Sequence, residues 1–174
     1  MEAGYIMFKD YINELHRLVE LIDENDIKRL ADQVLTSQKI YIIGNGGSLA
    51  TASHFAEDLL KMCDIPAIAI TDAPLITCFS NDYAYGECFS RALKTLVDKK
   101  DLIICISCSG NSLNIINTVQ NNVRTFALLG FGGGRVKNIV KDYILVDSSD
   151  YQLVEDVHLS ICHLVVKRLK EGIK

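Results

Sequence analysis

The segment Leu102-Ile103-Ile104-Cys105-Ile106-Ser107-Cys108-Ser109-Gly110-Asn111-Ser112 is the clearest indicator of the fold. Its first five residues are apolar without alternation, which is typical of a strand buried on both faces, and the residues after them suit a turn into a helix. Four further apolar runs have the same form, each followed by turn residues and then by a helical pattern. They occupy residues 40–43, 67–70, 126–129 and 143–146.

Strands that alternate with helices are joined by right-handed crossovers and lie parallel in one sheet. We therefore expect an α/β fold, a three-layer α/β/α sandwich around a five-stranded parallel sheet. Apolar residues at helical spacing predict two N-terminal helices, the second capped by Asn25 or Asp26, and a long final helix over about 150–170. The chain is expected to form a single domain, 1–174, in which residues 1–37 pack as a helical segment on the sheet domain or on a partner subunit.

The composition limits the possible functions. The length of 174 residues suits about one domain, and 49% hydrophobic with 23% charged residues is typical of a globular chain. The formal net charge of −4 argues against a nucleic-acid or anionic membrane partner, because either requires a cationic face. The apolar runs are too short to span a bilayer, and the first residues show no secretory signal. We expect a cytoplasmic protein without nucleic-acid or membrane partners.

The six cysteines are expected to be reduced thiols rather than disulfides. Cys78, Cys88, Cys105 and Cys162 lie among apolar neighbours, where free cysteine packs as a small hydrophobic residue. Cys105 and Cys108 match the C-x-x-C spacing, which leaves a redox or metal role as an alternative. However, no second pair completes a zinc site, and the pattern straddles the end of a strand.

Two loops that follow strands carry the residues expected to bind a ligand, because ligands of parallel α/β sheets lie beyond the carboxyl ends of the strands. At 44–48, Gly-Asn-Gly-Gly-Ser, glycines permit a close backbone approach at a helix N-terminus, although a tight turn uses the same residues. At 107–112, three hydroxyls and several amides converge on the start of a helix. Such a loop can hold a phosphate monoester without lysine or arginine. The alternative is helix capping by Ser109 or Ser112.

These two loops resemble the signature loops of the sugar isomerase (SIS) domain and, within that superfamily, those of the phosphoheptose isomerases. Four further segments resemble the same family in the same order: His-Phe-Ala at 54–56, the strand at 66–72, the Asn-Asp turn at 80–83 and the C-terminal helix at 155–163. The resemblance extends over about residues 30–169. It implies an aldose–ketose isomerase that interconverts sedoheptulose 7-phosphate and D-glycero-D-manno-heptose 7-phosphate in a homotetramer.

The resemblance also implies roles for individual residues. Asp58 is the implied base, and His163 opens the sugar ring or moves the protons of the oxygens. The implied metal ligands, which suit zinc or a similar divalent ion, are His54, Asp58, Glu155 and His163. The implied substrate-binding residues are Asn45, Gly46, Gly47, Ser48, Asp58, Asn81, Asp82, Ser107, Cys108, Ser109, Ser112 and Glu155.

Helical geometry bears on this assignment. His54 and Asp58 are i and i+4 on one helix, so their side chains share a face at ~6 Å between Cβ atoms. Glu155 and His163 are eight residues apart, ~12 Å along a straight helix, so both cannot easily reach one ion. We therefore expect a composite site, with His163 or Glu155 supplied by a neighbouring subunit. Taken alone, His54 also suits a core position, and Asp58 or Glu155 a solvated one. His158 suits a structural or supporting role rather than that of a ligand.

Three positions differ from the family pattern: Asp58 replaces glutamate, Glu155 replaces glutamine and Cys108 replaces threonine. The segment 59–66 is also shorter and lacks an arginine. Two alternatives to the heptose isomerase therefore remain. One is a non-catalytic SIS protein, either a phosphosugar-sensing regulator or a DnaA-binding factor similar to DiaA, and the other is an isomerase of a different phosphosugar. The full set of acid, base and imidazole groups favours the enzyme, because a binding protein has no need of it.

Overall fold

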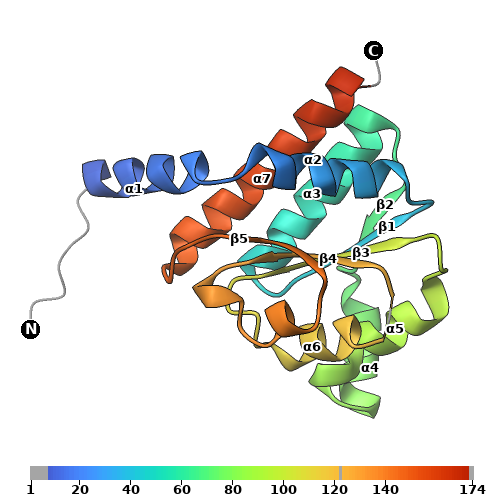
Figure 1. The fold of residues 1–174 in the computed structure, drawn as a ribbon. Helices are drawn as coiled ribbons and strands as arrows, with labels where there is room; N and C mark the ends of the chain where they lie inside the picture. Colours follow the sequence, from blue (N-terminus) through green and yellow to red (C-terminus); the bar gives the residue numbers. More distant parts are fainter. Residues whose placement is uncertain (1–7, 122, 173–174) are drawn as a thin grey trace, which may run out of the picture.

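A five-stranded sheet forms the centre of the computed structural model, which describes residues 8–121 and 123–172 (Figure 1). All neighbouring strands run parallel, in the order β2-β1-β3-β4-β5. The strands are β1 (Ile40–Ile43), β2 (Ala67–Ala69), β3 (Leu102–Ser107), β4 (Thr125–Leu129) and β5 (Asp142–Leu145). Their ends differ from the predicted runs by at most one residue, since pairing with neighbours sets where each strand ends.

Helices cover both faces of the sheet (Figure 1). On one face lie α1 (Phe8–Glu20), α2 (Glu24–Leu35), α3 (Gly47–Cys63) and α7 (Tyr151–Gly172). On the other lie α4 (Ala73–Asp82), α5 (Cys88–Leu96) and α6 (Leu113–Val119). Single 3₁₀ turns occur at Tyr85–Glu87, Phe131–Gly133 and Val136–Asn138. The predicted three-layer α/β/α sandwich is confirmed.

The alternation of side chains along β1 explains the two cores of the sandwich. Ile40 and Ile42 point into the core formed with α2, α3 and α7, whereas Tyr41 and Ile43 point into the core formed with α5 and α6. All four side chains are buried. Full burial of one such aliphatic side chain stabilises the fold by roughly 1.5–3 kcal/mol, so an uninterrupted apolar run is the pattern that a central strand requires.

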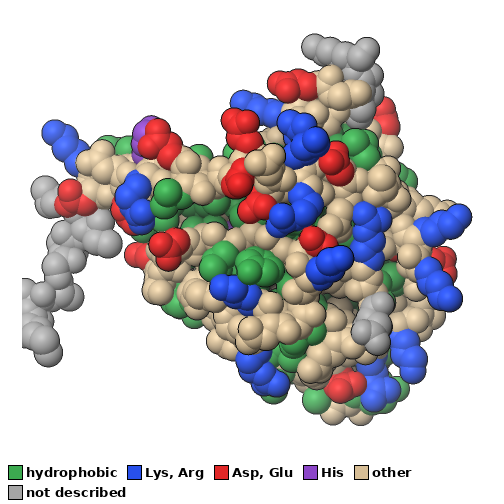
Figure 2. Space-filling view, in the orientation of Figure 1, with side chains coloured by type: hydrophobic (Ala, Val, Ile, Leu, Met, Phe, Trp, Pro, Cys, Tyr) green, Lys and Arg blue, Asp and Glu red, His purple; other side chains and the backbone are tan. Residues whose placement is uncertain are grey.

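The described part of the N-terminal segment packs on α7 and on the edge of the sheet. The Tyr11 hydroxyl donates to Asp156 Oδ2 at 2.6 Å, which joins α1 to α7, and this hydrogen bond raises the pKa of Tyr11 to about 12. Arg29 on α2 donates to the carbonyl of Tyr143 on β5. Over α2, in the view of Figure 2, acidic and basic side chains are interspersed, and Arg29 pairs with Asp26 at 2.9 Å.

The N-cap of α2 is Asp23, so the prediction of Asn25 or Asp26 was wrong. Asp23 has the extended backbone of a capping residue, with φ −69° and ψ 125°, and its carboxylate accepts from the Asn25 amide at 2.8 Å. The helix therefore begins two or three residues earlier than the apolar pattern suggested, because its first residues are polar and largely exposed to solvent.

The strand order creates a crevice beside β1. The chain passes from β1 to β2 on one side and then returns to β3 on the other side, so the order of strands reverses between β1 and β3. At such a reversal, the loops that follow the two strands diverge and leave space for a ligand. The glycine loop after β1 and the serine loop after β3 therefore border one crevice. Among the described helices, none has the length and apolar character needed to cross a bilayer.

Candidate functional site

A pocket of about 140 Å³ lies between the glycine loop and the serine loop. Seven of the residues predicted to bind substrate line it: Asn45, Ser48, Ser107, Cys108, Ser109, Ser112 and Glu155. Ile106 and Tyr151 complete the lining. Among the residues that the structure describes, no lysine or arginine lines this pocket, so the groups that can donate hydrogen bonds here are neutral hydroxyls, amides and backbone N–H groups.

The serine loop presents hydroxyl hydrogens to the pocket. Ser107 Oγ accepts from the Gly110 amide at 3.2 Å, and Ser109 Oγ accepts from the Asn111 amide at 3.3 Å. A hydroxyl that accepts in this way keeps its hydrogen to donate to a ligand. Ser112 is the N-cap residue of α6, but its hydroxyl forms no capping bond to the helix. Helix capping by Ser112 therefore does not account for the hydroxyl at this position.

The glycine loop brings Glu155 against the start of α3. Gly46 is the N-cap residue, with φ 55°, and Gly47 is the first residue of the helix. A Cβ on Gly47 would overlap the carboxylate of Glu155, so a larger residue there would displace the end of that side chain. The partial positive charge of the helix N-terminus favours a carboxylate there. Glu155 is thus an acidic group of the pocket itself.

Ser48 and Cys108 form the buried floor of the pocket. Both residues are at most 5% exposed, and Ser48 Oγ lies 3.8 Å from Cys108 Sγ. Burial raises the pKa of the Cys108 thiol, so Cys108 acts as a neutral, weakly polar wall. Cys105 faces the opposite core, and all six thiols are free. Cys105 and Cys108 therefore lie on different faces of the sheet, and the alternative of a joint redox or metal pair is contradicted.

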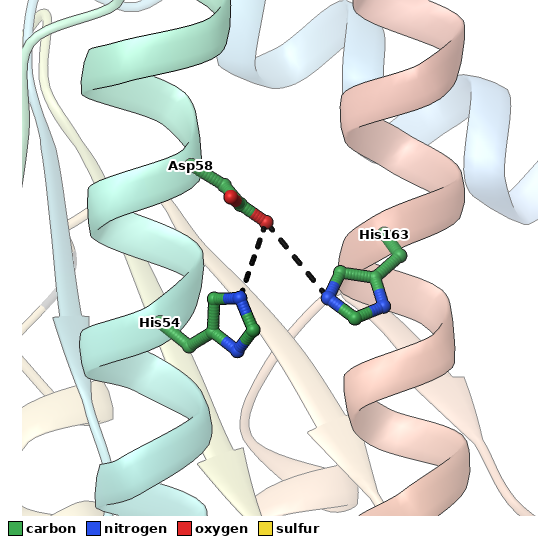
Figure 3. Close-up of side chains that lie close together, drawn as sticks. All are labelled: His54, Asp58 and His163. Atoms are coloured by element: carbon green, nitrogen blue, oxygen red, sulfur yellow. Dashed lines mark ion pairs between the residues drawn. The ribbon is translucent and has the colours of Figure 1, made fainter.

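A second polar cluster lies where α3 packs on α7. Asp58 Oδ2 lies 3.7 Å from His54 Nε2 and 3.9 Å from His163 Nε2. Figure 3 shows that the carboxylate of Asp58 faces both imidazole rings. The two imidazole rings meet edge to face, with 5.1 Å between their centroids. Both histidines are exposed, whereas Asp58 is 9% exposed. Neither separation is short enough for a direct hydrogen bond.

The three side chains have the composition and spacing of a metal site. One ligand atom from each lies within 4.8 Å of the other two. Ligand atoms that share one zinc ion at about 2.0–2.2 Å are themselves roughly 3–4 Å apart, and two imidazoles with a carboxylate suit a divalent transition metal. His163 joins this group from the same chain, so a neighbouring subunit is not needed to supply it. Glu155, the fourth predicted ligand, belongs to the pocket and not to this group.

The pocket and the His54–Asp58–His163 group lie along the same pair of helices, α3 and α7. Gly47 and His54 are seven residues apart on α3, and Glu155 and His163 are eight residues apart on α7. Both intervals correspond to roughly 10–12 Å along a helix. Gly47 and Glu155 lie at the pocket, and His54 and His163 lie in the histidine group. The pocket and the histidine group are therefore separated by about that length.

Two predicted substrate residues lie outside this site in the single chain. Asn81 and Asp82 are exposed at the end of α4, where Asn81 Nδ2 donates to Asp82 Oδ1 at 3.0 Å. Neither lines the pocket. Conversely, Tyr151 was not predicted, although it stands four residues before Glu155 and so shares its helix face. Its ring packs on Phe131 with 4.5 Å between centroids and forms one wall of the pocket.

Comparison with known proteins places this geometry in a family. Residues 8–125 match the SIS domain. A phosphoheptose isomerase of Geobacter sulfurreducens is 36% identical over 146 residues, which cover 78% of this chain and 77% of that protein. One from Glaesserella parasuis is 33% identical, with 95% and 91% of the two chains covered. The chain belongs to the phosphoheptose isomerase family of SIS domain proteins.

The fold of the family agrees over nearly the whole chain. The structure of phosphoheptose isomerase GmhA from Neisseria gonorrhoeae aligns with a TM-score of 0.85 at 28% sequence identity, and the alignment covers 93% of this chain and 94% of that one. The three departures from the family pattern fall at both ends of the site. Glu155 and Cys108 line the pocket, and Asp58 lies in the histidine group.

His158 is the remaining histidine of the family's C-terminal helix. It is fully buried, and neither ring nitrogen has a hydrogen-bond partner among the described residues. Burial lowers the pKa of His158 to about 4, against a smaller opposite effect of the Leu129 backbone. His158 is therefore neutral at pH 7 and forms part of the packing between α7 and the sheet, as its expected structural role requires.

The buried imidazole makes stability sensitive to acid. Below the ordinary pKa of histidine the unfolded chain binds a proton that the native chain does not, so the free energy of unfolding falls as pH drops from 6.5 towards 4. The lowered pKa of His158 corresponds to a loss of roughly 3 kcal/mol in the free energy of unfolding between pH 6.5 and pH 4. We expect His158→Leu to reduce this slope in urea unfolding experiments, whereas His16→Gln, at an exposed position of α1, retains it. An equal slope in wild type and His158→Leu would show that His158 does not cause the loss.

Proposed function

We propose that the protein is an aldose–ketose isomerase that interconverts sedoheptulose 7-phosphate and D-glycero-D-manno-heptose 7-phosphate. The observation that carries this proposal is the pairing of two chemistries in one site. One end offers neutral hydrogen-bond donors beside the carboxylate of Glu155, without a lysine or arginine, and the other end offers a carboxylate between two imidazoles. A phosphoryl group matches the first end, and proton transfer on a carbohydrate matches the second.

The length of the site suits a seven-carbon substrate. A fully extended heptose chain with its phosphate spans on the order of 10 Å. This matches the interval of roughly 10–12 Å between the two ends along α3 and α7. With the phosphoryl group among Ser107, Ser109 and Ser112, the carbonyl end extends towards Asp58. Binding of the remote phosphate then positions the reacting carbons, which is how binding energy serves the chemical step.

The proton transfers are assigned to Asp58 and His163. Asp58 removes a proton from C1 of the ketose and returns it to C2, and His163 moves a proton from O1 to O2. The intermediate is a cis-enediol, and the product is the aldose. Asp58 Oδ2 faces both imidazoles, so Oδ1 is the oxygen available to exchange the carbon-bound proton. Asp58 is shorter than the glutamate of the family, so the substrate must approach α3 more closely.

A divalent ion, which we assign as zinc, would be held by His54, Asp58 and His163, whose donor atoms fit such an ion. When bound, it supplies positive charge that polarises the sugar carbonyl. Glu155 was expected as a fourth ligand. In a single chain it lies at the pocket, where its carboxylate can accept hydrogen bonds from hydroxyls of the sugar.

The assembly is proposed to be a homotetramer with composite sites. Helix α4 has no fully buried residue, and its predicted substrate residues Asn81 and Asp82 lie outside the pocket of their own chain. Both facts suit a helix that completes a neighbouring subunit's site. We assign the enzyme to the cytoplasm, because six free thiols, five of them buried, suit a reducing compartment.

An isomerase for another phosphosugar is the second candidate, and the observation that favours it is the changed pocket wall at Cys108 and Glu155. Incubation of the purified protein with sugar phosphates of five to eight carbons separates the two candidates. The proposed function requires that sedoheptulose 7-phosphate be converted with the highest kcat/KM of the panel.

Asp58→Asn is expected to reduce kcat with sedoheptulose 7-phosphate by at least about a hundredfold, because the amide cannot accept the carbon-bound proton. Glu57→Gln is the matched control, since the neighbouring carboxylate is exposed and pairs with Lys61 on the same helix. The measurement is steady-state turnover, with circular dichroism to show that both variants are folded. Turnover of Asp58→Asn equal to wild type would exclude Asp58 as the base.

Wild-type protein dialysed against zinc is expected to retain about one ion per chain, and His54→Ala and His163→Ala to retain far less, because each removes one of three ligands. His16→Ala is the control, as this histidine pairs with Glu20 on α1. The measurement is metal content by mass spectrometry. Full retention by His54→Ala, or no retention by wild type, would contradict the proposed metal site.

A further inference from the structure

A closed hydrogen-bond network holds the side chain of Asn45 at the edge of the pocket. Asn45 Nδ2 donates to Asn114 Oδ1 at 3.0 Å, and Asn114 Nδ2 donates to Asn45 Oδ1 at 2.9 Å. The Tyr85 hydroxyl donates to the same Asn45 oxygen at 2.8 Å. The three side chains come from the loop after β1, from α6 and from the 3₁₀ turn before α5. Only Asn45 lines the pocket.

The orientation of both amides follows from one backbone group. The Ile115 amide donates to Asn114 Oδ1 at 3.0 Å, so an inverted Asn114 would place two donors against each other. With Asn114 oriented in this way, Asn45 must direct its Nδ2 towards Asn114 Oδ1 and its own oxygen towards Asn114 Nδ2. Asn114 is 1% exposed, and its second N–H lies 3.8 Å from Cys88 Sγ, so all its hydrogen-bonding groups have partners.

The network leaves Asn45 with a single free hydrogen-bonding group. An asparagine side chain has two acceptor lone pairs and two donor hydrogens. Both lone pairs of Asn45 Oδ1 are used, by Tyr85 and by Asn114, and one hydrogen of Nδ2 is used by Asn114. Within residues 8–121 and 123–172, the other N–H has no partner and remains for a ligand. Asn45 therefore offers the pocket a donor and no acceptor.

We propose that Asn114 and Tyr85 are positioning residues that make Asn45 a donor-only contact for a phosphoryl oxygen. The inference rests on the proposed function in so far as it takes the ligand to be a phosphate ester. The dianion of a phosphate ester has no P–OH group, so its oxygens accept hydrogen bonds and cannot donate them. An N–H held in a fixed orientation therefore matches such an oxygen. Because no lysine or arginine of the described residues lines the pocket, its preference for a phosphoryl group over a group that donates hydrogen bonds depends on oriented neutral donors such as this N–H.

Tyr85→Phe tests this proposal without endangering the fold, because Tyr85 is 57% exposed and the change removes one hydroxyl. Loss of that hydrogen bond frees an acceptor on Asn45 and loosens its amide. The expected result is a three- to tenfold weaker affinity for inorganic phosphate in calorimetry, about the effect of one hydrogen bond. KM for the sugar phosphate is expected to rise by the same factor with kcat unchanged, since the phosphate contact is present in both ground and transition states.

Tyr83→Phe is the matched control. Tyr83 is 54% exposed, and its ring stacks on Phe79 and on Arg91. We expect it to change phosphate affinity by less than about twofold. In an Asn45→Ala background, Tyr85→Phe is expected to have no further effect, because a residue that acts only through Asn45 has nothing left to position.

Three results would overturn the proposal: a wild-type protein that binds no phosphate, wild-type affinity in Tyr85→Phe, or an equal loss from Tyr85→Phe in the wild-type and Asn45→Ala backgrounds. The phosphate measurement does not depend on turnover. If phosphate affinity follows the network but no sugar phosphate is isomerised, the positioning role stands and the proposed reaction fails.

Discussion

The reversal of strand order between β1 and β3 is the constraint on which the rest of the site depends. Because β1 is paired with β2 on one side and with β3 on the other, the loops after β1 and β3 turn to opposite faces of the sheet. The pocket lies in the space between them. The proposed phosphate site can do without lysine or arginine, because two helices begin at the pocket and serine hydroxyls line it.

Packing of α3 on α7 supplies the second half of the site. The same helix pair brings Glu155 against Gly47 at one end and His163 beside His54 and Asp58 at the other. A substrate held between these ends is therefore positioned by rigid elements rather than by long loops, and rigid elements hold catalytic groups most accurately. Two of the residues that differ from the family pattern, Glu155 and Asp58, have surroundings that suit a carboxylate. The negative charge of Glu155 lies near a helix N-terminus, and the shorter Asp58 keeps its place between two imidazoles.

Much of the fold could be predicted from the sequence, because a strand buried on both faces leaves a continuous apolar run and each run here is followed by a helix. The strand order could not, since no local pattern records which strands become neighbours. The pairing of His54 with Asp58 follows from helical spacing alone. The approach of His163 depends on how α7 crosses α3, and the sequence led us to consider a neighbouring subunit as its source.

The hydrogen-bond network around Asn45 could not be predicted from the sequence. Tyr85 and Asn114 contact Asn45 across 40 and 69 residues of chain, and neither lies in a motif. Asn81 and Asp82 are the opposite case, since their motif is present but their own chain does not bring them to the pocket. Residues that act through tertiary contacts leave no periodic or local signal, so only the structure reveals them.

The most direct measurement is a crystal structure of the Asp58→Asn variant with sedoheptulose 7-phosphate bound. Our expectation is that the phosphorus lies among the hydroxyls of Ser107, Ser109 and Ser112, with C1 and C2 of the sugar beside the side chain at position 58. A sugar phosphate bound elsewhere, or in the reverse orientation with its phosphate at His54 and His163, would contradict it.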